Sequence, residues 1–270
     1  MAALRVVSWN IRAAIGPGPF PERWWSRIDA DRLRAIGAFL SPMDADVIAL
    51  QEVALLSRDG DLVDNAGDLG RQLGLNVRYG AVRSFDVVEA DARVGVGCFG
   101  NALLSRHPLA DVHVVALPRA AMDAYVEPSG SAHPAAGVTY ADAPDSIREP
   151  RCLLLASVGG VRVGTAHFSH VGSGERLLQA RATAAAFGGA TPTLLLGDLN
   201  APIEAPELAP FASWTDAFVE PRGDDARITT DDGHRIDHVL VRGASVSPVR
   251  VLRESAELSD HYPVVAELEW

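Results

Sequence analysis

Short apolar runs rich in branched residues limit the folds open to this chain more than any other feature of its sequence. They are bounded by Gly, Pro, Asp or Asn, which is the pattern of β-strands that end in turns. The runs cover residues 4–9, 47–50, 102–104, 152–158, 161–166, 193–196 and 239–241, and a last one covers 262–268. Strands are therefore predicted to outnumber helices.

Helical periodicity is clear in only two places. Residues 31–40 carry an apolar face and have Asp29 or Asp31 as the N-terminal cap. Residues 174–187 are rich in Ala and end at Gly188. Because strands and helices do not alternate regularly, we predict two sheets packed face to face with helices outside, rather than a doubly wound fold.

Composition indicates the class of protein. Of the 270 residues, 48% are hydrophobic and 22% are charged, which is typical of a globular protein that buries a full core. The formal net charge of −11 argues against a general polyanion-binding surface, although a bound cation can reverse the sign locally. Cys98 and Cys152 lie in apolar runs and are interpreted as buried hydrophobes.

The chain shows no sign of a targeting segment. It has no basic stretch followed by a long apolar core, and no apolar run reaches membrane-spanning length. We therefore expect a soluble cytoplasmic protein. Length alone allows one domain or two, but no linker or repeat divides the sequence. Residues 118–150 show no period and are predicted to form a long surface loop, a feature that is often functional in compact domains.

Polar side chains stand at the ends of the apolar runs. A single Asp or Asn in such a place is most simply a turn or a cap. Six runs end or begin with a carboxylate, an amide or an imidazole, which turns alone do not explain. The segments are Ser8-Trp9-Asn10, Gln51-Glu52, Thr165-Ala166-His167, Gly197-Asp198-Leu199-Asn200, Arg235-Ile236-Asp237-His238 and Ser259-Asp260-His261.

These strand ends also carry the candidate metal chemistry. If they converge on one edge, Glu52, Asp198, Asp237 and Asp260 place several negative charges at a single site. Carboxylates that cannot all remain ionised together either take up protons or bind a cation. Oxygen ligands without thiolates select hard ions such as Mg2+, Mn2+ or Ca2+.

Together with Gly100-Asn101-Ala102-Leu103-Leu104-Ser105-Arg106, these motifs follow one another in an order that resembles the endonuclease/exonuclease/phosphatase family, whose members include deoxyribonuclease I. They extend from residue 9 to residue 261, and the Gly-Asp-Leu-Asn segment is the strongest of them. The family implies an α/β (α+β) four-layer sandwich, in which two packed mixed β-sheets carry helices on their outer faces. It also implies a single domain over residues 1–270.

The resemblance implies a role for each matching residue. Glu52 resembles the carboxylate that holds the metal, with Asn10 beside it as a metal and substrate contact and Asp260 as a second acidic group. The implied catalytic residues are His261, Asp237, Asp198, Asn200 and His167.

Within this set, His261 resembles the essential histidine and Asp237 the carboxylate that orients it, a pairing that fixes the tautomer and stabilises the imidazolium. Asp198 and Asn200 resemble the pair that positions the attacking water and holds a phosphate oxygen. Either Asp198 or His261 can serve as the general base, and the family leaves this open.

Substrate contacts are implied for Arg148, Arg151 and Asn101. Arg148 lies in a segment that resembles a phosphate-contacting segment of deoxyribonuclease I, and Arg151 is the alternative in that role. For both arginines, a surface ion pair is the competing interpretation. Asn101 is equally well interpreted as a buried amide that supports neighbouring loops, and His170 as a solvated loop histidine.

Arg12 stands where apurinic endonucleases usually carry an extra acidic ligand, so we expect one main ion, held by Glu52. The resemblance implies divalent-metal-dependent hydrolysis of a phosphoester, foremost a phosphodiester, by a monomer that uses Mg2+, with Mn2+ or Ca2+ as alternatives. A nuclease acting on DNA or RNA is the first alternative, although the acidic charge does not favour nucleic acid. A non-enzymatic phosphate-ligand-binding protein on the same fold is the second.

Overall fold

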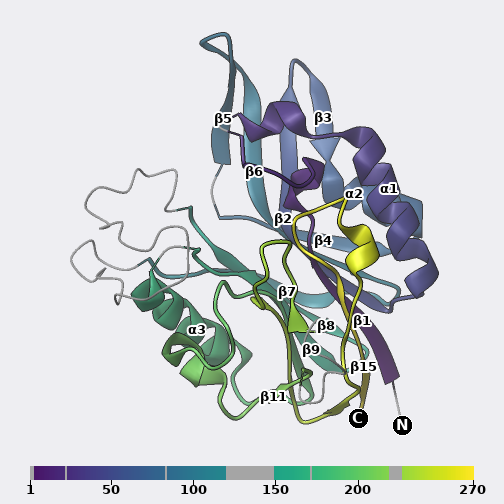
Figure 1. The fold of residues 1–270 in the computed structure, drawn as a ribbon, viewed down its shortest axis with the longest axis vertical. Coiled ribbons are helices and arrows are strands. Elements are labelled where there is room, and N and C mark those ends of the chain that lie inside the picture. The colour runs from purple at the N-terminus through teal and green to yellow at the C-terminus, as the bar shows by residue number, and fades with distance from the viewer. Residues whose placement is uncertain (1–2, 22, 83, 120–148, 171, 219–226) are drawn as a thin grey trace.

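Two β-sheets pack face to face and carry helices on their outer faces (Figure 1). The computed structural model describes residues 3–21, 23–82, 84–119, 149–170, 172–218 and 227–270. The predicted four-layer α/β sandwich with two mixed sheets is confirmed. The predicted loop at 118–150 lies almost wholly outside the described residues.

The first sheet has nine strands among the described residues. Its spatial order is β13 (Ser245–Val246), β15 (Val264–Glu269), β1 (Ala3–Asn10), β2 (Val47–Arg58), β6 (Ala92–Ser105) and β4 (Asn76–Gly80). Three further strands pair at its margins: β14 (Arg250–Val251) with β15, β3 (Asp61–Asp64) with β2, and β5 (Ser84–Glu89) with β6.

The second sheet has six strands in the part of the chain described. Their order is β11 (Thr215–Asp216), β12 (Asp237–Arg242), β10 (Thr193–Asp198), β9 (Val161–His167), β8 (Cys152–Val158) and β7 (Ala110–Ala116). Each sheet has one parallel pair in a mainly antiparallel arrangement. These pairs are β1 with β2 and β9 with β10.

Helices cover the outer face of each sheet. On the first sheet lie α1 (Ala30–Leu40) and α2 (Asn65–Leu73), and on the second lie α3 (Ser173–Phe187) and the 3-10 segment η5 (Pro206–Phe211). Shorter 3-10 segments are η1 (Arg12–Ala14), η2 (Trp24–Arg27), η3 (Ser41–Met43) and η7 (Arg253–Ser255). Within the described ranges, no helix combines the length and apolarity needed to cross a membrane.

The helix predicted at 31–40 is confirmed, and the cap is Asp29. Its Oδ1 accepts hydrogen bonds from the backbone N–H groups of Asp31 and Arg32, which have no partner within the helix. The Ala-rich helix is also confirmed, with Gly188 as its C-cap. The sequence did not predict α2, because its glycines Gly67 and Gly70 weaken the helical signal.

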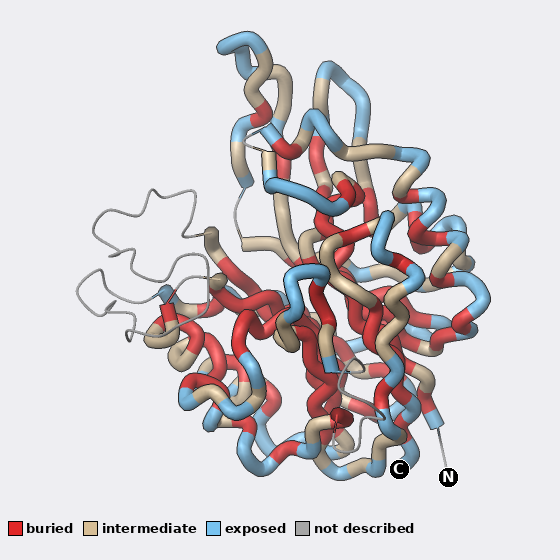
Figure 2. The backbone as a smooth tube through the Cα atoms, in the orientation of Figure 1, coloured by how far each residue is buried: buried red, intermediate tan, exposed pale blue. Residues whose placement is uncertain are grey.

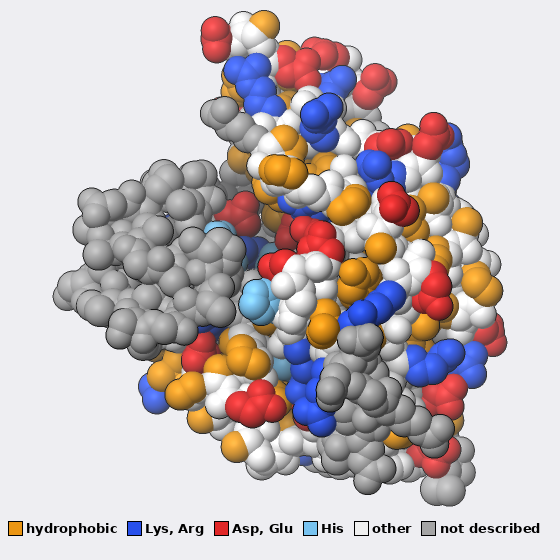
Figure 3. Space-filling model, viewed as in Figure 1, with side chains coloured by type: hydrophobic (Ala, Val, Ile, Leu, Met, Phe, Trp, Pro, Cys, Tyr) orange, Lys and Arg blue, Asp and Glu red, His pale blue; other side chains and the backbone are white. Residues whose placement is uncertain are grey.

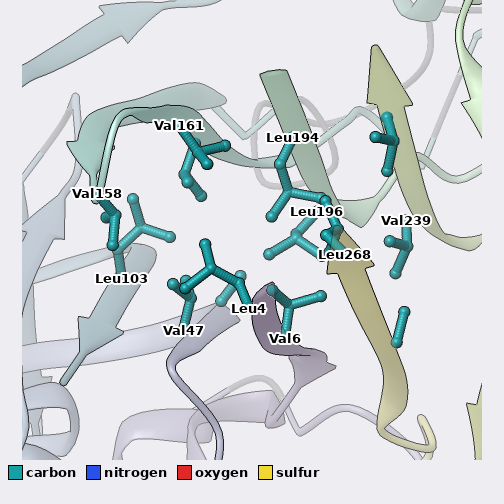
Figure 4. Close-up of a cluster of buried hydrophobic side chains, with 14 of the residues drawn as sticks. Leu4, Val6, Val47, Leu103, Val158, Val161, Leu194, Leu196, Val239 and Leu268 are labelled. Carbon is teal, nitrogen blue, oxygen red and sulfur yellow. The ribbon is translucent and has the colours of Figure 1, made fainter. Parts of the chain in front are cut away.

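The main core lies between the sheets, where side chains from both sheets point toward one another (Figure 4). Val6 of β1 and Val47 of β2 face Leu194 and Leu196 of β10 across this layer. Each is fully buried, and burying such a side chain stabilises the fold by roughly 1.5–3 kcal/mol. Figure 2 shows that buried residues concentrate on the strands.

One strand departs from its prediction in a way that matters for the site. The apolar run at 47–50 is only the first part of β2, which continues to Arg58 through a bulge between Leu50 and Val53. Glu52 lies in this bulge with φ +53, a conformation that a non-glycine residue adopts only under constraint. The polar pair Gln51-Glu52, which the sequence places at the end of a strand, is therefore an interruption inside a longer strand.

Gly197 gives a testable link between the fold and the site, because it precedes Asp198 on β10. Its φ is +157, and a Cβ would lie 2.0 Å from the backbone oxygen of Ala166 on β9. Gly197→Ala is therefore expected to lower the free energy of unfolding by more than about 2 kcal/mol in urea denaturation. Gly189→Ala is the matched control, because a Cβ there meets no atom within 4 Å. Equal stability of the two variants would contradict this account of the β9–β10 contact.

Candidate active site

The strand ends converge because each sheet contains a parallel pair. In the first sheet Asn10 pairs with Gln51, and in the second Asp198 pairs with both His167 and Asp237. The two edges meet directly, since Asn10 Nδ2 lies 3.2 Å from Asp198 Oδ2. Acidic and histidine side chains come to the surface together near the middle of the face shown in Figure 3.

Buried hydrogen bonds hold the two edges in register. Gln51 Nε2 donates to Thr165 Oγ1 at 2.9 Å, which connects β2 to β9 between the sheets. Ser259 Oγ donates to the backbone oxygen of Asn10 at 2.8 Å, and Trp9 Nε1 donates to that of His261 at 2.9 Å. These two hydrogen bonds therefore hold residues 259–261 against the end of β1.

Glu52 presents a carboxylate that is only half satisfied. Its Oε1 accepts a 2.9 Å hydrogen bond from Asn10 Nδ2, while its buried Oε2 has no hydrogen-bond partner among the described residues. Burial, and then the negative charge of Asp260, raise the pKa of Glu52 to about 7. A buried carboxylate oxygen without a donor is the feature that a bound cation would satisfy.

Asp260 lies close enough to Glu52 for their charges to interact, but it is also ion-paired. Arg12 Nε lies 3.1 Å from Asp260 Oδ2, and Arg12 Nη1 donates to the backbone oxygen of Gly16 at 2.7 Å. Arg12 is 5% exposed, so this charge is fixed inside the site. Asp260 therefore has a guanidinium partner, whereas Oε2 of Glu52 has no partner among the described residues.

Asp198 is the centre of the site's hydrogen bonding. Its Oδ1 accepts from the backbone N–H of Asn200 at 2.9 Å. Its Oδ2 faces Asn10, with His167 Nε2 at 3.4 Å and His261 Nε2 at 3.7 Å. Burial, opposed by the positive charge of His261, raises the pKa of Asp198 to about 6. The raised pKa makes this carboxylate a better proton acceptor than an ordinary aspartate.

His261 and Asp237 form the pair that the sequence predicted. His261 Nδ1 lies 2.9 Å from Asp237 Oδ2. Burial of the imidazole opposes protonation, but the charge and hydrogen bond of Asp237 outweigh it and raise the pKa of His261 well above its ordinary value. The geometry therefore favours an imidazolium whose Nε2–H points toward Asp198.

His167 has different neighbours. Its Nδ1 lies 2.9 Å from Nη1 of Arg151, whose Nη2 lies 3.3 Å from Nδ1 of His170. Burial, followed by the positive charge of Arg151, lowers the pKa of His167 well below its ordinary value. His170 lies half-buried in the loop after β9, in keeping with its interpretation as a loop histidine, and its contact with Arg151 was not predicted. Its spacing of three residues from His167 was the available sequence signal.

The remaining predicted residues are placed as follows. Asn200 lies at the site with φ +50, and its Nδ2 donates to the backbone oxygen of Phe168 at 3.0 Å. Asn101 is 2% exposed, and its Nδ2 donates to the backbone oxygen of Cys152 at 2.9 Å, which matches the supporting-amide interpretation. Arg148 lies outside the described residues.

Two groups of side chains could hold a metal ion. Asp198, Asp237 and His261 offer ligand atoms within 4.8 Å of one another, and Asp237 Oδ1 is buried without a partner among the described residues, but a 2.9 Å contact already joins His261 Nδ1 to Asp237 Oδ2. Glu52 offers a carboxylate oxygen without a donor, and Asn10 offers an amide oxygen that accepts one hydrogen bond, from the backbone N–H of Arg12. Such oxygens suit a hard cation. The oxygen ligands at Glu52 therefore fit a divalent ion better than the group of Asp198, Asp237 and His261 does.

Comparisons with known proteins bear on the family and the fold. A family model described as the endonuclease/exonuclease/phosphatase family matches residues 7–261. Among proteins with curated descriptions, none matches the chain. An endonuclease/exonuclease/phosphatase from Beutenbergia cavernae is 23% identical with a TM-score of 0.70, over 99% of this chain and 71% of that chain.

Two further solved structures contain DNA. D. rerio TDP2, complexed with a single-strand DNA product, is 16% identical with a TM-score of 0.63, over 100% of both chains. The 3′ phosphatase NExo from Neisseria, bound to a product DNA hairpin, is 21% identical with a TM-score of 0.60, over 99% of this chain and 100% of that chain. At these identities the likeness establishes the fold.

Proposed function

The chain belongs to the endonuclease/exonuclease/phosphatase family, and on that premise we propose that it is a divalent-metal-dependent phosphoesterase that hydrolyses a phosphodiester by attack of water. The observation that carries the proposal is the free carboxylate oxygen of Glu52, beside Asn10 and next to a carboxylate flanked by two histidines. Mg2+ is the proposed ion.

Glu52 and Asn10 would hold the cation, with Asp260 as an outer acidic neighbour. When bound, a cation there supplies positive charge to the phosphate oxygens and polarises the phosphorus–oxygen bond. Arg12 occupies the place where a further acidic ligand would bind, and its contact with Asp260 supports one main ion rather than two. A cation bound to Glu52 would also offset the cost of burying the negative charge of this carboxylate.

Asp198 and His261 divide the proton chemistry. Asp198 is ionised at neutral pH and can accept the proton of the attacking water, since the pKa of its carboxyl is raised to about 6. His261 is held as an imidazolium by Asp237, so it can donate a hydrogen bond from Nε2 to the phosphate. Asn200, whose backbone N–H orients Asp198, completes the water-positioning group. The geometry thus favours Asp198 over His261 as the base.

The test is a panel of phosphodiesters, phosphomonoesters, duplex DNA, single-stranded DNA and RNA, each with Mg2+ and with excess chelator. We expect hydrolysis of at least one phosphodiester with Mg2+ and its loss with chelator. Preference for a nucleic acid would identify the nuclease alternative at the same site. Absence of hydrolysis across the panel, with Mg2+ or Mn2+, would contradict the proposed activity and favour a phosphate-ligand-binding protein.

A further inference from the structure

Arg151 precedes β8 and is 7% exposed, which is unusual for a side chain that binds a substrate from solvent. Both terminal nitrogens contact imidazoles, Nη1 that of His167 and Nη2 that of His170. Its Nε is buried without a hydrogen-bond partner among the described residues. Nη1 also lies 3.4 Å from Glu149 Oε2, so the ion pair that competed as an interpretation of Arg151 is present. Little of the guanidinium is therefore directed at a phosphate.

A guanidinium only donates hydrogen bonds and stays protonated at any pH at which the protein is folded. An imidazole nitrogen that contacts it must be the acceptor and must carry no proton. Nδ1 of His167, at 2.9 Å from Arg151 Nη1, is such a nitrogen. The ring is therefore neutral, with its one proton on Nε2, the nitrogen 3.4 Å from Asp198 Oδ2.

We propose that Arg151 is a positioning residue that keeps His167 neutral and directs its single proton from Nε2 toward Asp198 and the reacting phosphate. The inference rests on the proposed function for its catalytic consequence only. The protonation of His167 is measured without a substrate, so the two proposals can fail separately.

The consequence is an asymmetry between two histidines that face the same carboxylate oxygen. His261 has a carboxylate at Nδ1 and is charged, whereas His167 has a guanidinium at Nδ1 and is neutral. If His167 were also protonated, it would compete with His261 for Asp198 and form an ion pair with that carboxylate. A neutral His167 can donate one hydrogen bond without neutralising the base.

The charged and titratable groups that face His167 are Arg151, His170, His261 and Asp198. Removing Arg151 leaves Asp198 as the nearest opposite charge and frees Nδ1 to take a proton. The pKa of His167 should then rise by about one unit or more, because Arg151 is a positive charge in direct contact. The burial of the ring remains and limits the rise.

The experiment uses protein labelled with 15N-histidine, in which NMR of the ring nitrogens reports protonation between pH 5.5 and 8. The His167 signals are assigned by their loss in His167→Gln. In the wild type we expect a neutral ring with the proton on Nε2 across this range. Arg151→Met should make His167 titrate within it, and Arg151→Lys, which restores an obligatory donor, should keep the ring largely neutral. Arg162→Met, at the opposite end of β9, is the matched control and should change neither result.

Turnover provides the second readout. Arg151→Met should lower kcat on the order of tenfold to a hundredfold, the usual cost of losing a group that orients a catalytic imidazole. The loss should grow as the pH falls from 8 to 6, because protonated His167 then pairs with Asp198. Direct phosphate binding by Arg151 would instead raise KM and leave the titration of His167 unchanged.

A wild-type His167 that is protonated at pH 6, or an unchanged titration in Arg151→Met, would overturn the positioning role. If Arg151→Met does not fold, the wild-type spectrum and the Arg151→Lys variant still test whether Arg151 keeps His167 neutral. If the wild type hydrolyses no phosphoester, the proposed function fails while the NMR result stands.

Discussion

Glu52→Gln is expected to lower kcat on a phosphodiester about a thousandfold or more at saturating Mg2+. The variant keeps the shape of the side chain but removes the charge that would hold the cation. Metal ions contribute several kcal/mol of transition-state stabilisation, and each 1.4 kcal/mol corresponds to about tenfold in rate. Glu267→Gln is the matched control, since this exposed glutamate of β15 pairs with Arg5 away from the site. It should retain wild-type kcat.

The same variant separates loss of metal binding from loss of folding. The folded pKa of Glu52 is about 7, above its ordinary value of 4.5, so ionisation of this group destabilises the metal-free fold as the pH rises between these values. At pH 8 without metal, Glu52→Gln should therefore melt at the same temperature as the wild type or higher. Mg2+ should raise the melting temperature of the wild type only. A variant with full activity, or with the wild-type response to Mg2+, would refute the role of Glu52.

His261→Ala is expected to lower kcat on the order of a hundredfold or more, the usual size of a contribution from a positioned acid or base. The variant removes the imidazolium that faces Asp198 and leaves Asp237 buried without its partner. Asp237→Asn should lower kcat less than His261→Ala does, because the imidazole remains but loses the group that fixes its tautomer and charge. His113 is an exposed histidine of β7, so His113→Ala is the control and should leave kcat unchanged. A His261→Ala enzyme within a few-fold of wild type would exclude the assignment.

The pH dependence distinguishes the base from the charged donor. With Asp198 as base, kcat should rise as its carboxyl ionises near pH 6 and then stay high until His261 loses its proton on the alkaline side. Asp237→Asn removes the main cause of the raised His261 pKa, so the alkaline decline should move to lower pH. Turnover that rises through the ionisation of His261 would instead make His261 the base.

The sequence predicted the layers of the fold well, because they depend on local patterns. Most predicted runs became strands, and Asp29 of α1 was among the predicted caps. The predictions failed where a strand carries polar or glycine residues inside it. β2 passes through Glu52 by a bulge, and β6 begins at Ala92, ten residues before the predicted run, in a glycine-rich stretch. Such strands are stabilised by pairing with neighbours, which no local pattern records.

The sequence predicted the composition of the site and its His261–Asp237 pair, but not the other contacts among its side chains. The order of the motifs brought Glu52, Asp198 and His261 into one group. In the structure Asn10 contacts both Glu52 and Asp198, and His261 faces Asp198. The contact of Arg151 with His167 could not be predicted, because it depends on two strand ends, β8 and β9, meeting side by side. A sequence shows which polar groups lie at strand ends but does not show which nitrogen each histidine presents to its neighbour.

The central claim is that hydrolysis depends on a divalent ion at Glu52, and the most direct test is the initial rate on a phosphodiester as Mg2+ is added to chelator-treated protein. We predict no activity without the ion and a hyperbolic rise to a single plateau, as expected for one main ion. A rate in excess chelator equal to the rate at saturating Mg2+ would contradict the claim.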